Sequence, residues 1–175
     1  MAAARLGRPV PGSSVLFLCD LQERFRGSIA AFPQIVAVAA RMLQGTPKSG
    51  IFGERAPFKP PVFGVRRWRD PPGSPGTPRI HPKFGPPLPK QTTLDLLERG
   101  LDVHVVADAV SSRSQVERAL ALSRMRQAGA YLSTCESLLL LLLRDYAHPK
   151  FRQILPLIKE PPPDTGLILG ALGGL

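Results

Sequence analysis

Residues 92–118 read TTLDLLERGLDVHVVADAVSSRSQVER, and this stretch decides the fold. Its first part is a short amphipathic pattern that stops at Gly100, and glycine commonly follows the end of a helix. Residues 101–110 are mostly apolar, which indicates a strand with little exposure to solvent. The stretch therefore predicts a helix followed by a strand.

A second helix is expected to follow this strand. In a capping box, a hydroxyl and a glutamate or glutamine three residues later satisfy the first N–H groups of a helix. Two pairs fit the pattern, Ser112 with Gln115 and Ser114 with Glu117. The helix runs to Gly129 in either case. Apolar side chains at helical spacing are expected to form its buried side: Val116, Ala119, Leu120, Leu122 and Met125.

The alternation of strand and helix continues on both sides of this stretch. Toward the N-terminus, residues 14–20 (SVLFLCD) are an apolar run that suits a strand covered on both faces, and residues 32–44 have helical spacing. Toward the C-terminus, residues 130–134 predict a strand, and residues 136–145 and 149–160 predict helices. This order is typical of an α/β domain with a parallel sheet.

Residues 45–91 interrupt the domain with sequence of a different kind. They hold 12 of the chain's 20 prolines, and no segment keeps the period of a helix or a strand. Because proline lacks an N–H donor and blocks regular elements, we expect this insert to be disordered. The predicted organisation is a split domain at 13–44 and 92–160, with tails at 1–12 and 161–175.

The insert also carries most of the positive charge. It holds nine Lys and Arg residues against two acids, while the formal net charge of the whole chain is +10. Residues 65–69 (VRRWR) place Trp68 among arginines, a pattern that can bind RNA by stacking. A solvated basic tract is the more common meaning of such sequence, so nucleic acid is not the expected partner. We hypothesise that the chain is an alternative or mispredicted splice product, which peptides spanning the junctions of the insert would test.

The two cysteines, Cys19 and Cys135, form neither a disulfide framework nor a metal-ligand spacing. Reduced thiols predict a cytoplasmic location, with the nucleus as the alternative and the mitochondrion less favoured. The apolar runs are far shorter than the roughly 18 residues that a membrane span needs, so no membrane partner is expected. The histidines lie at no metal-ligand spacing, and no metal or other cofactor is expected: His81, His104 and His148.

Two parts of the chain resemble the isochorismatase-like hydrolase family. Residues 13–25 (SSVLFLCDLQERF) and 32–43 (FPQIVAVAARML) are similar to its start, and residues 92–118 and 125–136 (MRQAGAYLSTCE) to its later part. The resemblance implies a parallel sheet with helices on both faces, here incomplete because the family's second to fourth strands have no counterpart. It also implies hydrolysis of a small carbonyl or amide-like molecule through a covalent cysteine adduct, without metal.

The family's catalytic triad is an aspartate, a lysine and a cysteine. Only the aspartate can be carried over, to Asp20, which lies with Gln22 and Phe25 in the family's D-x-Q-x-x-F setting. The cysteine precedes the helix that begins near Thr92, where this chain has GPPLPKQ at 85–91. None of four lysines has the family's context: Lys48, Lys59, Lys83 and Lys90. The resemblance therefore predicts an inactive family member that keeps Asp20 as a remnant.

Other interpretations of these residues stay open. Asp20 could cap a turn after a strand and have no chemical role. Cys135 lies near a helix N-terminus, where a thiolate is favoured, and could replace the missing nucleophile. It belongs, however, to a different strand-to-helix connection from the one the family uses. For the whole chain, the alternatives are a non-catalytic module whose partner is a protein, and a non-functional splice variant.

Overall fold

The computed structural model describes residues 7–9, 14, 16–18, 21–48 and 90–166. The helices in these ranges are α1 (Phe32–Lys48), α2 (Lys90–Glu98), α3 (Gln115–Gln127), α4 (Cys135–Leu143) and α5 (Phe151–Lys159). The strands are β1 (His104–Val106) and β2 (Tyr131–Ser133), and short 3₁₀ turns lie at η1 (Glu23–Phe25) and η2 (Ala107–Ala109). Among these helices, none is long and apolar enough to cross a membrane.

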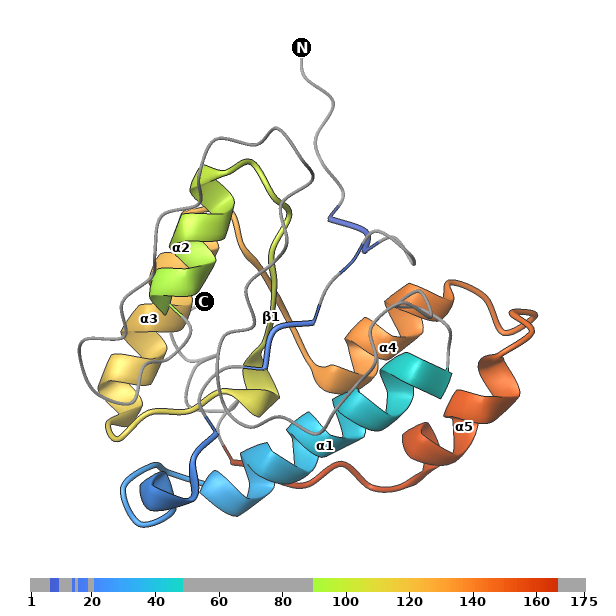
Figure 1. Cartoon of the computed structure of the whole chain (residues 1–175), viewed down its shortest axis with the longest axis horizontal. Coiled ribbons are helices and arrows are strands. Elements are labelled where there is room, and N and C mark those ends of the chain that lie inside the picture. The colour runs from blue at the N-terminus through green and yellow to red at the C-terminus, as the bar shows by residue number, and fades with distance from the viewer. Residues whose placement is uncertain (1–6, 10–13, 15, 19–20, 49–89, 167–175) are drawn as a thin grey trace, which may run out of the picture.

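The two strands form a parallel pair at the centre of the described structure. His104 pairs with Tyr131, and Val105 pairs with Leu132. Because side chains alternate across a strand, Val105 packs with α2 and α3 on one face, while Val106 packs with α1 and α4 on the other. Figure 1 shows α2 and α3 on one side of β1, and α1, α4 and α5 on the other. The expected parallel sheet with helices on both faces is confirmed.

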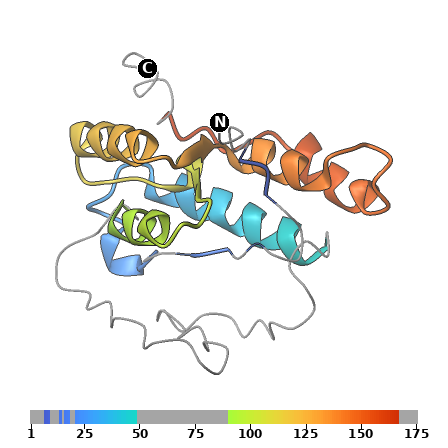
Figure 2. The ribbon, with the colours of Figure 1, turned by 90° about the horizontal axis from the view of Figure 1, so that it is seen from above.

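The core consists of an apolar cluster on each side of the strand pair. On the α1 side, Val38 and Met42 pack against Leu139 and Leu142 of α4. On the other side, Val105 packs against Leu122 and Met125 of α3. Helix α1 crosses the middle of the molecule in Figure 2, and its buried side packs against α4 and against Val106 at the end of β1. Helices α1 and α4 are far apart in the sequence, yet their buried side chains form one apolar cluster.

The strand expected at 14–20 does not form at its described positions. Ser14 and Leu16–Leu18 have no strand conformation, and Phe17 and Leu18 are exposed. Leu16 packs against the cluster between α1 and α4, so the segment still contributes to the core. A strand needs a neighbouring backbone to pair with, and in the described ranges the only pairing is that of β1 with β2. At the described positions the strand prediction was wrong, since no strand of the described ranges pairs with them.

The strand expected at 101–110 is shorter than its apolar pattern suggests. Only His104–Val106 is extended and paired, and the chain then turns into η2. The strand at 130–134 is confirmed by β2, and the helices expected around it are confirmed with small shifts at their ends.

The start of α3 follows the second of the two capping boxes. The Ser114 hydroxyl accepts a hydrogen bond from the Glu117 N–H at 3.4 Å. The predicted buried side was wrong at Val116 and Leu120, which are 68% and 62% exposed. Arg118 is buried instead, and its guanidinium donates hydrogen bonds to the carbonyl groups of Ala107 and Val110.

The boundaries of the predicted insert also shift. Helix α1 continues through Gly45 to Lys48, and α2 already begins at Lys90. A Cβ on Gly45 would lie 2.7 Å from Leu139 Cδ2, so this glycine allows α1 and α4 to approach closely. The rest of the stretch expected to be disordered lies outside the described residues.

The N-terminal tail expected at 1–12 lies mostly outside the described residues, but three of its residues do not. Gly7 and Pro9 are buried, and Gly7 has a φ of +55°. A Cβ on Gly7 would collide with the Tyr131 ring, so the glycine fits closely against β2.

Candidate functional site

The candidate site lies at the carboxyl ends of β1 and β2. In open parallel sheets, ligands bind outside the carboxyl ends of the strands. Here β1 leads into η2, which carries Asp108, and β2 leads to Thr134, the N-cap of α4. The Thr134 hydroxyl accepts a hydrogen bond from the Ser137 N–H at 3.2 Å. Two strand ends therefore place a carboxylate and a helix N-terminus side by side.

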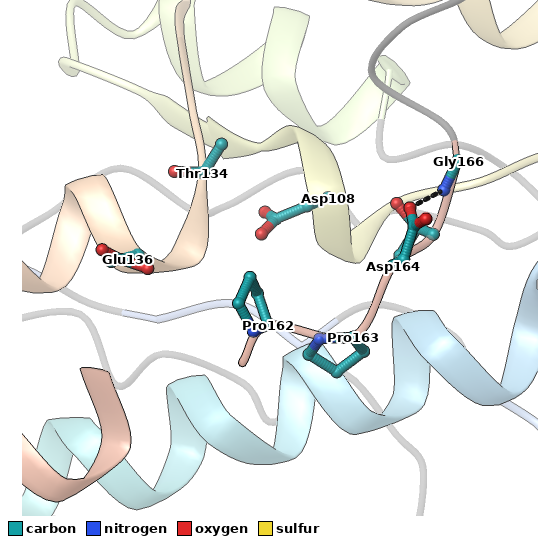
Figure 3. Close-up of a pocket in the computed structure, with 8 residues that line it drawn as sticks. Asp108, Thr134, Glu136, Pro162, Pro163, Asp164 and Gly166 are labelled. Atoms are coloured by element: carbon teal, nitrogen blue, oxygen red, sulfur yellow. Dashed lines mark hydrogen bonds between the residues drawn. The ribbon is translucent and has the colours of Figure 1, made fainter. Parts of the chain in front are cut away.

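An open cleft of about 310 Å³ lies at this edge. Figure 3 shows Asp108, Thr134 and Glu136 on one side of it and Pro162, Pro163 and Asp164 facing them. Thr165 and Gly166 complete the lining. Three of the lining side chains are carboxylates, so the cleft is acidic although the chain as a whole is basic.

Asp108 holds the N-terminus of α4 through its carboxylate. Its Oδ1 and Oδ2 accept hydrogen bonds from the Cys135 N–H at 3.0 and 3.2 Å. Burial nevertheless raises the pKa of Asp108, against the opposing effects of the Cys135 N–H and the positive charges of Arg118 and Arg41. Both carboxylate oxygens of Asp108 therefore bind the backbone at the start of α4.

Cys135 is buried directly beneath this contact. Burial raises the pKa of its thiol to about 12, and the neighbouring Asp108 carboxylate adds to the shift. These effects outweigh the helix N-terminus, which alone would favour a thiolate. The thiol is therefore protonated at neutral pH and is a poor nucleophile.

Arg118 fixes the turn that carries Asp108. Its Nε donates a hydrogen bond to the Val110 carbonyl at 2.9 Å, and its Nη2 donates one to the Ala107 carbonyl at 2.6 Å. These two bonds span η2 from beginning to end. Burial lowers the pKa of Arg118, and Asp108 opposes that shift. Arg118 is therefore a positioning residue for the Asp108 carboxylate.

The sequence did not single out Asp108 or Arg118. For Asp108 a signal existed, since it follows a strand just as Asp20 follows the apolar run at 14–20. Nothing in the sequence indicated that Arg118 would be buried, because an arginine within an amphipathic helix is usually exposed.

Several predicted site residues cannot be placed. Asp20 and Cys19 lie outside the described residues, as do Lys59, Lys83 and His81.

The other two residues of the D-x-Q-x-x-F pattern are described. Gln22 precedes η1, and Phe25 packs against the cluster of Phe32 and Ile35. Lys90 is exposed at the first residue of α2, and the adjacent Gln91 donates a hydrogen bond to Asp95. The start of this helix therefore presents an ammonium and an amide where the resemblance implies a thiol.

The two described histidines lie apart from the cleft and from each other. The ring of His104 stacks on Tyr131 at 5.0 Å between centroids, and both of its nitrogens are buried without a hydrogen-bond partner. The Nδ1 of His148 accepts a hydrogen bond from the Lys150 N–H in the turn before α5. Within the described ranges, no three His, Cys, Asp or Glu side chains are arranged to hold a metal ion.

Comparison with known proteins identifies the family. Residues 90–137 match the isochorismatase domain. Over 196 residues, the chain is 50% identical to isochorismatase domain-containing protein 2 of Homo sapiens, with 96% of this chain and 95% of that protein covered. The chain belongs to the isochorismatase family. The mouse protein 2A is 47% identical over 199 residues, covering 96% of this chain and 94% of the relative.

Solved structures support the isochorismatase fold. The MAR1 ribonuclease of Caenorhabditis elegans is 32% identical with a TM-score of 0.66, covering 91% of this chain and 96% of that one. A hypothetical protein from Trypanosoma cruzi is 26% identical with a TM-score of 0.56, and the match covers 82% of this chain and 90% of that one. The resemblance seen in the sequence is thus confirmed, and the cleft lies at the strand ends of an isochorismatase domain.

The effect of Asp108 on Cys135 can be measured directly. Asp108→Asn, in a Cys19→Ser background, should lower the pKa of Cys135 from about 12, because the neighbouring negative charge is removed. The thiol pKa should stay above its ordinary value of about 8.5, since burial is the larger cause. The pH dependence of alkylation by iodoacetamide gives the pKa. Asp145→Asn, which changes an exposed carboxylate just beyond α4, is the control and should shift it little; an equal shift in both variants would contradict the assignment.

Proposed function

We propose that this isochorismatase-domain chain has no cysteine-hydrolase activity of the family kind. The observation that carries the proposal is the state of Cys135, whose thiol is buried and has a pKa of about 12. A nucleophilic cysteine needs partial exposure and a lowered pKa, whereas here burial and the Asp108 carboxylate outweigh the positive charge of Arg41. The other cysteine, Cys19, precedes the remnant aspartate directly in the sequence.

The start of α2 supports the same proposal. By resemblance, the family's nucleophile precedes this helix, and here Pro89, Lys90 and Gln91 occupy those positions. Covalent catalysis depends on holding a thiolate and its base in one geometry, which can account for about 7 to 11 kcal/mol of the barrier. Without the thiol, that contribution is lost whatever the position of Asp20.

Asp108 does not restore the missing chemistry. A general base must reach the proton that it removes, and both oxygens of Asp108 accept from the Cys135 N–H. The carboxylate therefore serves the helix terminus, and its charge opposes ionisation of the thiol.

The test is turnover of a panel of amide, ester and RNA substrates by the purified chain. RNA belongs in the panel because the C. elegans structure with the same fold is named a ribonuclease. We expect hydrolysis at the uncatalysed rate for every substrate. For RNA, the carboxylates of Asp108, Glu136 and Asp164 would repel phosphate groups in the cleft.

Three single variants provide the controls: Cys19→Ser, Cys135→Ser and Asp20→Asn. If the chain is inactive, none of them changes the measured rates. Turnover above background that disappears in any one of them, with the melting temperature unchanged, would contradict the proposal and identify the nucleophile or its base.

A further inference from the structure

His104 is a titratable side chain that takes no part in the cleft. It is the first residue of β1, and its ring stacks on that of Tyr131, the first residue of β2, with 5.0 Å between the ring centroids and 24° between the ring planes. The two residues are also partners in the register of the strand pair. The stack therefore lies at the amino end of the strand pair, and the cleft lies at the carboxyl end.

Both ring nitrogens of His104 are shielded from solvent and have no hydrogen-bond partner in the described structure. In a neutral imidazole one nitrogen donates and the other accepts, whereas in the imidazolium both nitrogens donate. Protonation here would create a charged group with two unpaired donors, which a shielded position disfavours. Burial accordingly lowers the pKa of His104, against the opposing charge of Asp102.

The groups around the ring compensate a positive charge only in part. Asp102 lies two residues before His104 and favours the imidazolium, but burial has the larger effect on the pKa. Tyr131 offers the face of its ring, which attracts a cation but supplies no oxygen within hydrogen-bonding reach of the imidazole nitrogens. Arg8, in the segment beside Tyr131, is exposed and adds a further positive charge.

Residues 7–9 rest against the same stack. A Cβ on Gly7 would collide with Cε1 and Cζ of Tyr131, so the backbone at Gly7 lies directly on this ring, and Gly7 and Pro9 are buried. We infer that the stack of His104 on Tyr131 is a pH-sensitive latch. It is closed while His104 is neutral, and protonation of His104 opens this end of the strand pair and moves Tyr131 away from residues 7–9. The inference does not depend on whether the chain catalyses any reaction.

The direction of the pH effect follows from the lowered pKa of His104. The histidine favours the closed form fully above its ordinary pKa of 6.5, and this contribution is lost as the pH falls toward the lower value of the closed form. Each unit between the two pKa values raises the open population about tenfold at acid pH. Asp108 acts in the opposite direction, because its raised pKa makes acidification stabilising. The test must therefore separate the two groups.

NMR spectroscopy of the full chain between pH 7.5 and pH 5 provides the test. The Cε1 proton of His104 should titrate below pH 6.5. As it titrates, the nuclear Overhauser contacts between Gly7 and the Tyr131 ring should weaken. The Tyr131 N–H donates to the Val103 carbonyl at 2.9 Å beside the stack, and its protection from hydrogen exchange should fall over the same range. The amide of Leu139 in α4 should keep its protection, which distinguishes local opening from unfolding.

Two variants isolate the imidazole. His104→Phe keeps an aromatic ring on Tyr131 but cannot be protonated, so its contacts and its Tyr131 protection should not change over this pH range. His148→Asn removes the other described histidine, keeps an acceptor for the Lys150 N–H, and should respond to acid as the wild type does. A His104 pKa at or above 6.5 in the wild type would overturn the inference even if His104→Phe does not fold. Persistence of the Gly7 contacts at pH 5, an equal acid response in His104→Phe, or an equal loss of protection at Leu139 would also overturn it.

Discussion

Arg118→Met is expected to lower the free energy of unfolding by about 2 to 6 kcal/mol at neutral pH, because two carbonyl groups lose their donor. Arg118 is 1% exposed and donates to the carbonyls of Ala107 and Val110. Methionine fills similar space but leaves both carbonyls without this donor and removes the cation that acts on Asp108. Leaving a buried hydrogen-bonding group without its partner costs about 1 to 3 kcal/mol, and two carbonyls lose their donor here. A domain has only about 5 to 15 kcal/mol of stability in total, so the loss is a large part of it.

The effect of Arg118→Met should depend on pH, with a defined sign. The folded-state pKa of Asp108 is raised by burial, so its ionisation lowers stability as the pH rises from the unfolded-state value toward the folded one. Arg118 opposes this shift, and its loss raises that pKa further. The stability deficit should therefore be larger at neutral pH than near the ordinary carboxylate pKa of about 4.

Urea unfolding of the wild type and the variant at both pH values measures the deficit. Arg126→Met is the matched control, because Arg126 lies on the same helix and is exposed. It should change the midpoint little, as exposed charges usually do. Equal deficits in the two variants, or a deficit in Arg118→Met that grows on acidification, would contradict the role assigned to Arg118.

Helices with both a cap and an amphipathic pattern could be predicted from the sequence. Two capping boxes predicted the start of α3, and the structure follows the one formed by Ser114 and Glu117. Gly100, with its φ of +76°, lies just past the end of α2. Strands were harder, because a strand depends on a neighbour that its own residues do not specify. Residues 14–20 have the composition of a buried strand, yet Leu16–Leu18 are unpaired as strand and Phe17 is exposed.

The residues of the candidate site were not predicted from the sequence. The family resemblance led to Asp20, which lies outside the described residues, whereas the position of Asp108 directly after β1 was a signal that went unused. What could not be predicted is which backbone groups are left needing a partner after folding. That need explains why Arg118 is buried while Val116 and Leu120 on the same helix are exposed.

Leu139→Ala is expected to cost about 2 to 5 kcal/mol, the range for buried leucines whose surroundings do not collapse. Leu139 is 1% exposed and packs between α4 and α1 with Val38 and Met42. Leu140→Ala is the matched control. Leu140 is the next residue in the same helix and is 39% exposed, so its substitution should cost much less stability. Similar urea midpoints for the two variants would contradict the packing described here.

Gly45 makes this prediction sharper, because a side chain there and Leu139 compete for the same space. In the wild type, Gly45→Ala would place a Cβ 2.7 Å from Leu139 Cδ2, so Leu139 must shift and stability should fall. In the Leu139→Ala background that contact is gone, and the new methyl group partly fills the cavity. Alanine also favours a helix interior over glycine by about 1 kcal/mol, and Gly45 lies within α1. The same substitution should therefore destabilise the wild type and stabilise the Leu139→Ala variant, whereas additive effects in a double-mutant cycle of urea midpoints would show that α1 and α4 do not meet at these residues.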